Sequence, residues 1–143
     1  MTKEVVITGI GMISPVGNNI DDSWNNLING NSGIDTIKSF DPSELETKIA
    51  GEIKDFNPID LIGKKESRRM DRFSQLAIVA SQEALNSAQL NIDETNEHRV
   101  SVMITSGIGG IITISEQIDI LRDKGPSRIS PFLVPMMLPD MAS

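Results

Sequence analysis

The sequence predicts an α/β fold. Two apolar, largely β-branched runs, residues 5–8 and 100–104, have the character of strands buried on both faces of a sheet. Each run ends in a glycine-rich turn, and a stretch with helical spacing of its apolar residues follows each turn. This order of strand, turn and helix occurs twice and indicates helices packed against a sheet.

The first predicted helix follows the first glycine turn. Trp24, Leu27 and Ile28 recur at spacings of three and four residues, and acidic Asp21 lies at the positive end of this helix. Gly30 ends it. The next stretch, residues 34–63, is rich in Asp, Ser, Pro and Gly, so we expect loops there, with one weak strand around residues 49–53.

Helical spacing is clearest over residues 65–88. One apolar stripe runs along this segment and consists of Phe73, Leu76, Ala77, Ala80, Ala84, Leu85 and Ala88. A further helix is predicted over residues 112–124, ended by Gly125 and Pro126. Residues 130–143 contain three prolines among apolar residues, too much proline for a regular element and too much apolar surface for an uncovered loop.

Composition excludes several classes of function. The chain of 143 residues has 20 acidic and 13 basic residues, a formal charge of -7, which disfavours nucleic acid or an anionic membrane as a partner. Cysteine is absent, so these residues form no disulfide or thiolate metal site. We see neither a targeting segment nor an apolar run long enough for a membrane helix, and we expect a cytoplasmic protein.

The glycine-rich turns do not predict nucleotide binding. In the first turn, Ser14 occupies the position of a required glycine and Pro15 interrupts the passage into a helix. In the second, Ile112 stands where the third glycine belongs. His98, the only histidine, lies in a polar connector. We therefore predict no catalytic, cofactor-binding or metal-binding residue in this chain, and structural roles for the glycines.

A cluster of positive charge stands out in this acidic chain. Five basic residues occur within nine positions and are opposed only by Glu66 and Asp71; they are Lys64, Lys65, Arg68, Arg69 and Arg72. On a continuous helix most of them share one face near the amino terminus, where the helix dipole disfavours each cation by about 0.3–1 kcal/mol. A solvated charged face and a docking surface for an acidic partner both remain open interpretations.

Four segments together resemble one enzyme family. They are residues 5–17 (VVITGIGMISPVG), 68–73 (RRMDRF), 106–110 (SGIGG) and 125–132 (GPSRISPF). In this order and spacing they resemble the β-ketoacyl-acyl carrier protein synthases, in particular the type II enzymes, along nearly the whole chain. The resemblance implies the opening part of the first half of a thiolase-like layered αβαβα fold.

The resemblance also implies an activity. Family members condense malonyl-acyl carrier protein with an acyl group held as a thioester on a cysteine, and two histidines assist. The matching cysteine would lie shortly beyond Ser143 and the histidines farther still, so we expect residues 1–143 to be an incomplete domain without catalytic residues. His98 replaces neither histidine. No cofactor is implied, and the family forms homodimers.

Other family roles fall on residues that are present. The resemblance implies that Lys65, Arg68 and Arg69 receive the acidic carrier protein, and that Arg128 contributes from a second basic stretch, although Ser127 replaces a basic residue often found beside it. Ile108 matches the residue that gates the fatty acyl pocket, with a plain core isoleucine as the alternative.

The proline-containing segment gains an explanation in the same way. In the family it crosses toward the second subunit, which makes Phe132 and Leu133 candidate residues of the acyl pocket; burial within one subunit is the alternative. Two other functions stay open for the chain as a whole. One is a non-catalytic module that binds an acyl carrier protein, and the other, weakened by Ser14, is a short nucleotide-binding domain.

Overall fold

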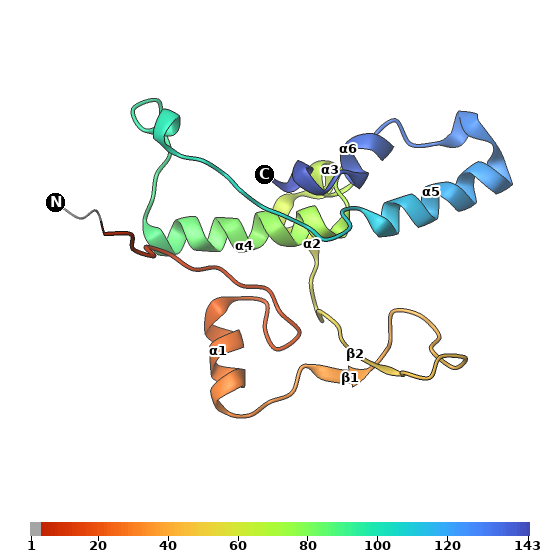
Figure 1. Cartoon of the computed structure of the whole chain (residues 1–143), viewed down its shortest axis with the longest axis horizontal. Helices are drawn as coiled ribbons and strands as arrows, with labels where there is room; N and C mark the ends of the chain where they lie inside the picture. Colours follow the sequence, from red (N-terminus) through yellow and green to blue (C-terminus); the bar gives the residue numbers. More distant parts are fainter. Residues whose placement is uncertain (1–3) are drawn as a thin grey trace. The chain divides into compact units, whose positions relative to one another are not determined.

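The computed structural model describes residues 4–143. Two compact units make up the chain: Met1–Phe56 with Ala80–Asn91, and Asn57–Val79 with Ile92–Ser143. Figure 1 follows the chain through its helices and its small sheet. The predicted α/β class is confirmed in this general form, as a partial α/β domain.

The first unit contains the predicted short helix and a small sheet. Helix α1 spans Ile20–Ile28, and the side chain of Asn19 accepts a hydrogen bond from the backbone N–H of Asp22, which caps the helix. Strands β1 (Ile34–Thr36) and β2 (Ile49–Gly51) pair antiparallel, with Ile34 opposite Gly51. The expected weak strand near Ile49 is therefore present, and its partner lies upstream in the same loop-rich region.

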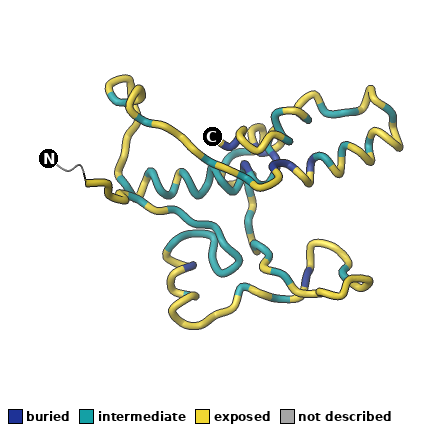
Figure 2. Tube along the Cα trace, in the orientation of Figure 1, coloured by how far each residue is buried: buried dark blue, intermediate teal, exposed yellow. Residues whose placement is uncertain are grey.

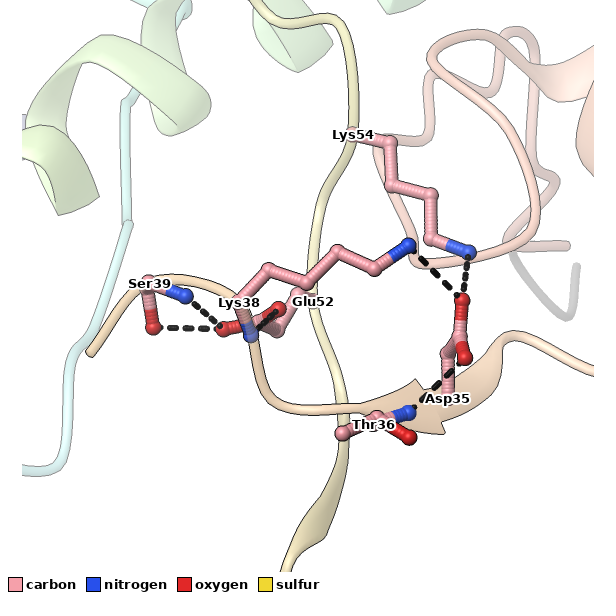
Figure 3. A network of polar contacts seen from close by, with 6 residues as sticks. All are labelled: Asp35, Thr36, Lys38, Ser39, Glu52 and Lys54. Atoms are coloured by element: carbon pink, nitrogen blue, oxygen red, sulfur yellow. Dashed lines mark hydrogen bonds and ion pairs between the residues drawn. The ribbon is translucent and has the colours of Figure 1, made fainter. Parts of the chain in front are cut away.

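Charged side chains hold the loop between these strands (Figure 3). The carboxylate of Asp35 lies 3.3 Å from Lys38 Nζ and 3.2 Å from Lys54 Nζ. Hydrogen bonds from Thr36, Lys54 and Lys38 lower the pKa of Asp35 to about 2. The carboxylate of Glu52 accepts hydrogen bonds from the backbone N–H groups of Lys38 and Ser39. The carboxylates of Asp35 and Glu52 therefore both hold the start of this loop.

Close packing explains the first glycine-rich turn. A Cβ atom on Gly9 or Gly11 would overlap the backbone of helix α4 (Arg72–Ala88) at Ala84 or Ala80, respectively. The carboxylate of Glu83 on the same helix accepts hydrogen bonds from the backbone N–H of Met12 and of Ile20, both at 2.8 Å. These contacts support a structural role for the two glycines, because the backbone of α4 occupies the space that a side chain at either position would need.

The second unit is helical. It begins with α2 (Pro58–Ile62), α3 (Lys64–Ser67) and the first part of α4. After the short 3₁₀-helix η1 (Glu97–Arg99), α5 spans Ile111–Lys124 and ends at Gly125, as predicted. The 3₁₀-helix η2 (Pro126–Arg128), helix α6 (Leu133–Met137) and the 3₁₀-helix η3 (Pro139–Ala142) follow. In Figure 1, α6 folds back along α5.

The predicted continuous helix over residues 65–88 is wrong at its start. Helix α3 ends at Ser67, and α4 begins only at Arg72. Arg68 to Asp71 form a turn, in which Asp71 lies immediately before α4 and accepts a hydrogen bond from the backbone N–H of Phe73 with its side chain. An aspartate in this position favours the start of a helix rather than its interior, which explains the break.

The two predicted buried strands are also not formed. Neither residues 5–8 nor residues 100–104 pair with any other segment among residues 4–143. Val5, Ile7 and Met103 are more than four-fifths exposed, and Figure 2 shows both segments mostly exposed. A strand requires a neighbouring strand to pair its backbone N–H and C=O groups, and no segment among residues 4–143 pairs with these runs in that way. Only single bonds reach the second run: the Ser143 hydroxyl bonds the N–H and C=O of Ile104, and the N–H of Val100 donates to the carbonyl of Glu97.

The proline-containing segment is more regular than expected. Pro135 lies within α6 and Pro139 begins η3, so two short helical elements form despite the prolines. Both elements are only about one turn long, and proline is tolerated in a first turn because its missing N–H would have no helical partner there. Among residues 4–143, no helix combines the length and the apolar character that crossing a membrane requires.

Candidate functional site

A recess lined by positive charge lies on the second unit. Its volume is about 390 Å³, and its wall consists of Lys64, Lys65, Arg68, Arg69 and Phe132. The four basic residues are exposed. The structure thus brings together three residues that the sequence assigned to docking, and adds Lys64 and an aromatic ring from a distant part of the chain.

A glutamine holds the basic turn in place. Gln75 Nε2 donates hydrogen bonds to the carbonyl oxygens of Ser67, at 2.8 Å, and Met70, at 3.2 Å. The hydroxyl of buried Ser67 donates to the carbonyl of Lys64. These bonds satisfy carbonyl groups at the end of α3 and in the turn, so the backbone that carries the cations is fixed by uncharged groups.

Phe132 contributes the aromatic wall. The guanidinium carbon of Arg69 lies 4.9 Å from the centre of the Phe132 ring. A cation–π contact of this kind at an exposed site contributes about 0.5–1 kcal/mol. Phe132 is 37% exposed, so part of its ring faces the recess as an apolar surface beside the cations. The recess therefore combines charge recognition with a small apolar contact.

The cations of the recess form no ion pair with any other of residues 4–143. These cations are Lys64, Lys65, Arg68 and Arg69. Positive charge concentrated on an acidic protein attracts acidic groups.

The cations do not lie on one long helix, as the sequence predicts. Helix α3 has only four residues, and a turn separates it from α4. The unfavourable interaction of a cation with the positive end of a long helix therefore applies at most to Arg72.

A second recess is apolar. It has a volume of about 190 Å³ and lies between α5 and the segment that follows it; its lining is Ile114, Gln117, Ile118, Leu121, Ile129, Leu133 and Met137. Gln117 Oε1 accepts a hydrogen bond from the backbone N–H of Ser130 at 2.7 Å, which fixes that segment against α5. The lining suits an apolar ligand group or a packing partner, not a charged one.

Two predicted site residues, Ile108 and Arg128, lie outside both recesses. Ile108 is 66% exposed in the turn that precedes α5. Arg128 is exposed at the end of η2, and His98 is exposed in η1. Leu133 lines the apolar recess, whereas Phe132 borders the basic one. Within residues 4–143, no group of acidic or histidine side chains is arranged to hold a metal ion.

The turn that carries Ile108 is held firmly from one side. Gly109 has a φ of +74°, and a Cβ at this residue would overlap the carbonyl oxygen of Met137. The backbone N–H of Gly110 donates to that same oxygen at 3.0 Å. Glycine is required at residue 109 because of this conformation and this close approach.

Sequence reasoning missed two contributors. The resemblance places Phe132 in a pocket and not in the basic cluster, and no pattern in the sequence links it to Arg69, which lies in a distant segment. In the sequence, Asp71 stands out only as a charge opposing the cluster. Its place directly before the apolar periodicity of Phe73, Leu76 and Ala77 is a helix-start signal that could have identified it.

The comparisons with known proteins agree along the whole chain. Residues 2–143 match the family model of the β-ketoacyl synthase amino-terminal domain. The 3-oxoacyl-[acyl-carrier-protein] synthase 2 of Staphylococcus aureus (strain COL) is 52% identical over 141 residues, which cover 99% of this chain and 34% of that protein. The protein of the same name from Synechocystis sp. (strain ATCC 27184 / PCC 6803 / Kazusa) is 48% identical over the same shares.

A solved structure is also similar. The crystal structure of a β-ketoacyl synthase from Burkholderia phymatum STM815 superposes with a TM-score of 0.79 at 26% identity, and the match covers 99% of this chain and 35% of that one. The chain thus spans about a third of the length of the curated relatives and of this structure.

Proposed function

This chain belongs to the β-ketoacyl synthase family as its amino-terminal domain, and we propose that the complete protein elongates fatty acids. The reaction is a decarboxylative Claisen condensation. Carbon 2 of a malonyl group on acyl carrier protein attacks the carbonyl carbon of an acyl thioester on the enzyme; the malonyl carboxylate leaves as carbon dioxide and the enzyme thiol is released. The observation that carries this proposal is about 50% identity over nearly the full chain to two proteins named as synthases of 3-oxoacyl-[acyl-carrier-protein], the product of this reaction.

The basic recess is the proposed docking site for the acidic carrier protein. Lys65, Arg68 and Arg69 lie together in it, without ion-pair partners among residues 4–143, in a chain of net charge -7. An acidic partner would supply the opposite charge, which residues 4–143 do not place in ion pairs with these cations. Arg128 is proposed as a further contact outside the recess.

The acyl chain is proposed to meet Ile108, Phe132 and Leu133. Leu133 already lines an apolar recess, and Ile108 projects from a turn with most of its surface uncovered. The Phe132 ring contacts Arg69, so in this proposal it lies where the carrier and the acyl chain meet. Substituting Phe132 is therefore expected to change both carrier affinity and acyl selection.

The remainder of the complete protein is proposed to supply the cysteine and the two histidines, which this chain lacks. It is also proposed to complete a thiolase-like layered αβαβα fold, in which residues 5–8 and 100–104 become strands. The exposure of most side chains in these apolar runs supports the proposal, because neither run is paired with another strand among residues 4–143. The apolar surface around α5 and α6 is proposed to form part of a homodimer contact in a cytoplasmic enzyme.

A non-catalytic module that binds acyl carrier protein is the competing function, favoured by the absence of cysteine from this chain. One experiment separates the two. The complete protein is incubated with malonyl- and acyl-carrier protein, and the elongated 3-oxoacyl product and released carbon dioxide are measured. Product formation supports the synthase, whereas carrier binding without product identifies the module.

A further inference from the structure

We propose that Asp71 is a positioning residue that fixes the turn carrying Ile108 and thereby affects which acyl chains the enzyme selects. This inference rests on the proposed role of Ile108 in the acyl pocket. It concerns a residue that touches neither the proposed acyl chain nor the proposed carrier.

One carboxylate of Asp71 caps two helices. Asp71 is only 4% exposed. Its Oδ2 accepts hydrogen bonds from the backbone N–H of Thr113 at 2.9 Å and from Thr113 Oγ1 at 2.6 Å. Its Oδ1 accepts from the backbone N–H of Phe73, in the first turn of α4, at 3.3 Å. The start of α4 and the start of α5 are thus fixed to a single side chain.

Helix α5 depends on this carboxylate because its own cap residue has no side chain. Gly110 precedes the helix, and no side chain at that position hydrogen-bonds the first turn. Asp71 supplies the missing acceptor and places a negative charge at the positive end of the helix dipole. The position of the first turn of α5 therefore follows the position of Asp71.

The Ile108 turn is continuous with that first turn. On one side, Gly109 and Gly110 pack against the carbonyl groups of Met136 and Met137, and Gly110 hydrogen-bonds the latter. On the other side, Asp71 holds α5 through Thr113. Ile108 is 66% exposed and has little packing of its own, so these two backbone anchors determine where it lies.

Asp71 also ends the segment that lines the basic recess. Arg68 and Arg69 belong to the same turn, which Gln75 holds by its backbone carbonyls. A carboxylate at the end of this turn connects the proposed docking segment with the proposed acyl-selecting turn. Loss of the connection is expected to alter acyl selection, beyond any loss of folded protein.

The test measures selection as a ratio. Asp71→Asn and Thr113→Val are introduced into the complete protein, and kcat/KM is determined for a long-chain and a short-chain acyl-carrier protein. The ratio of the two values does not depend on the fraction of enzyme that is folded, so a purely stabilising role leaves it unchanged. Asparagine has one acceptor oxygen and cannot serve both helices, while valine removes the Thr113 hydroxyl donor.

The chain offers a matched control. Asp93 accepts hydrogen bonds from the backbone N–H of Thr95 at 2.8 Å and from Thr95 Oγ1 at 2.6 Å, the same pair of donors as at Asp71. This pair is local and exposed, so Asp93→Asn is expected to leave the ratio unchanged. Thr113→Ser keeps both donors and is expected to retain the wild-type ratio.

We expect Asp71→Asn and Thr113→Val to change the ratio by about threefold or more. A wild-type ratio in both variants overturns the inference; if Asp71→Asn does not fold, Thr113→Val decides alone. Ile108→Phe is measured in parallel. If it changes the ratio and the other two variants do not, the inference fails while the pocket proposal stands. If Ile108→Phe leaves the ratio unchanged, the pocket proposal fails and the inference with it.

Discussion

The buried carboxylate of Asp71 accepts two hydrogen bonds from Thr113, a residue 42 positions further along the chain. No other charged side chain among residues 4–143 is as fully buried. The cations just before Asp71 in the same turn are exposed. Opposite charges in neighbouring positions therefore have different surroundings: the carboxylate is buried, and the cations are exposed.

Reversing two cations of the basic recess is expected to weaken carrier binding. Arg68→Glu with Arg69→Glu in the complete protein replaces attraction by repulsion, and we expect the Kd for acyl carrier protein to rise about tenfold or more at low salt. The difference should shrink toward 1 M salt, where the screening length is only about 3 Å. Arg122→Glu with Lys124→Glu, at two exposed positions of α5, makes the same change in net charge and serves as the control. Equal affinities at low salt would remove the docking proposal.

Removing the ring of Phe132 is expected to weaken the same interaction by a smaller factor. Phe132→Ala loses the contact with Arg69 and the apolar wall, and a change of about 0.5–1 kcal/mol corresponds to a two- to fivefold higher Kd. Calorimetric titration with the carrier measures it. Phe40→Ala, at a 56% exposed phenylalanine outside the recess, should bind like the wild type. A Phe132 variant with unchanged affinity would show that the ring only supports the fold.

Enlarging Ile108 is expected to shorten the preferred acyl chain. Ile108→Phe adds bulk at the proposed pocket entrance, and selection by an apolar pocket shifts by about 1–3 kcal/mol for each methylene that no longer fits. Product lengths from the complete enzyme, resolved by mass spectrometry, give the profile. Ile28→Phe, on an exposed position of α1, controls for added apolar surface. If Ile108→Phe leaves the distribution of product chain lengths unaltered, Ile108 does not gate the acyl pocket.

Truncating Glu83 is expected to destabilise the protein. Glu83→Ala removes the acceptor of the Met12 and Ile20 backbone N–H groups, and we expect a loss of about 1–3 kcal/mol in the free energy of unfolding. Urea denaturation of the complete protein measures this loss. Glu116→Ala, at an exposed position of α5, should stay within about 0.5 kcal/mol of the wild type. Similar stabilities for the two variants would contradict the role of Glu83.

Asp35 is expected to titrate with a pKa of about 2, below its ordinary value of 3.8, because Thr36, Lys54 and Lys38 hydrogen-bond its ionised form. A lowered folded pKa means that this stabilisation is complete above pH 3.8 and is lost as the pH falls through about 2. A carboxyl NMR titration measures it. Lys54→Met should raise the pKa of Asp35 and leave that of Glu52, which Ser39 and Lys38 lower, unchanged. A wild-type Asp35 midpoint near 4 would contradict the network.

Local patterns were sufficient for the elements whose causes are local. Helix α1 was identified from its acidic start and the spacing of Trp24 and Leu27, and α5 from its apolar face and Gly125. The break before Arg72 was missed because the apolar stripe that begins at Phe73 says nothing about the residues before it. The apolar patterns at residues 5–8 and 100–104 indicate that these runs can form strands, but a strand forms only when a second segment pairs with it.

The sequence predicts only part of the basic recess, again because only some of its contacts are local. Lys65, Arg68 and Arg69 are close in sequence, so their charge was visible as a cluster. Phe132 contacts Arg69, and Thr113 contacts Asp71, only because distant segments of the chain pack together. Such contacts depend on how α4, α5 and α6 pack, which the helical spacing of each segment does not specify.

The sequence alone determined the family resemblance, the concentration of positive charge within an acidic chain, and the absence of a cysteine nucleophile from these residues. Only the tertiary structure decided that an aromatic ring walls the basic recess, and that one carboxylate caps both α4 and α5. The physical reason is the range of the interactions. Charge and helical spacing are properties of neighbouring residues, whereas a ring beside a guanidinium or a carboxylate between two helices exists only after distant segments have packed together.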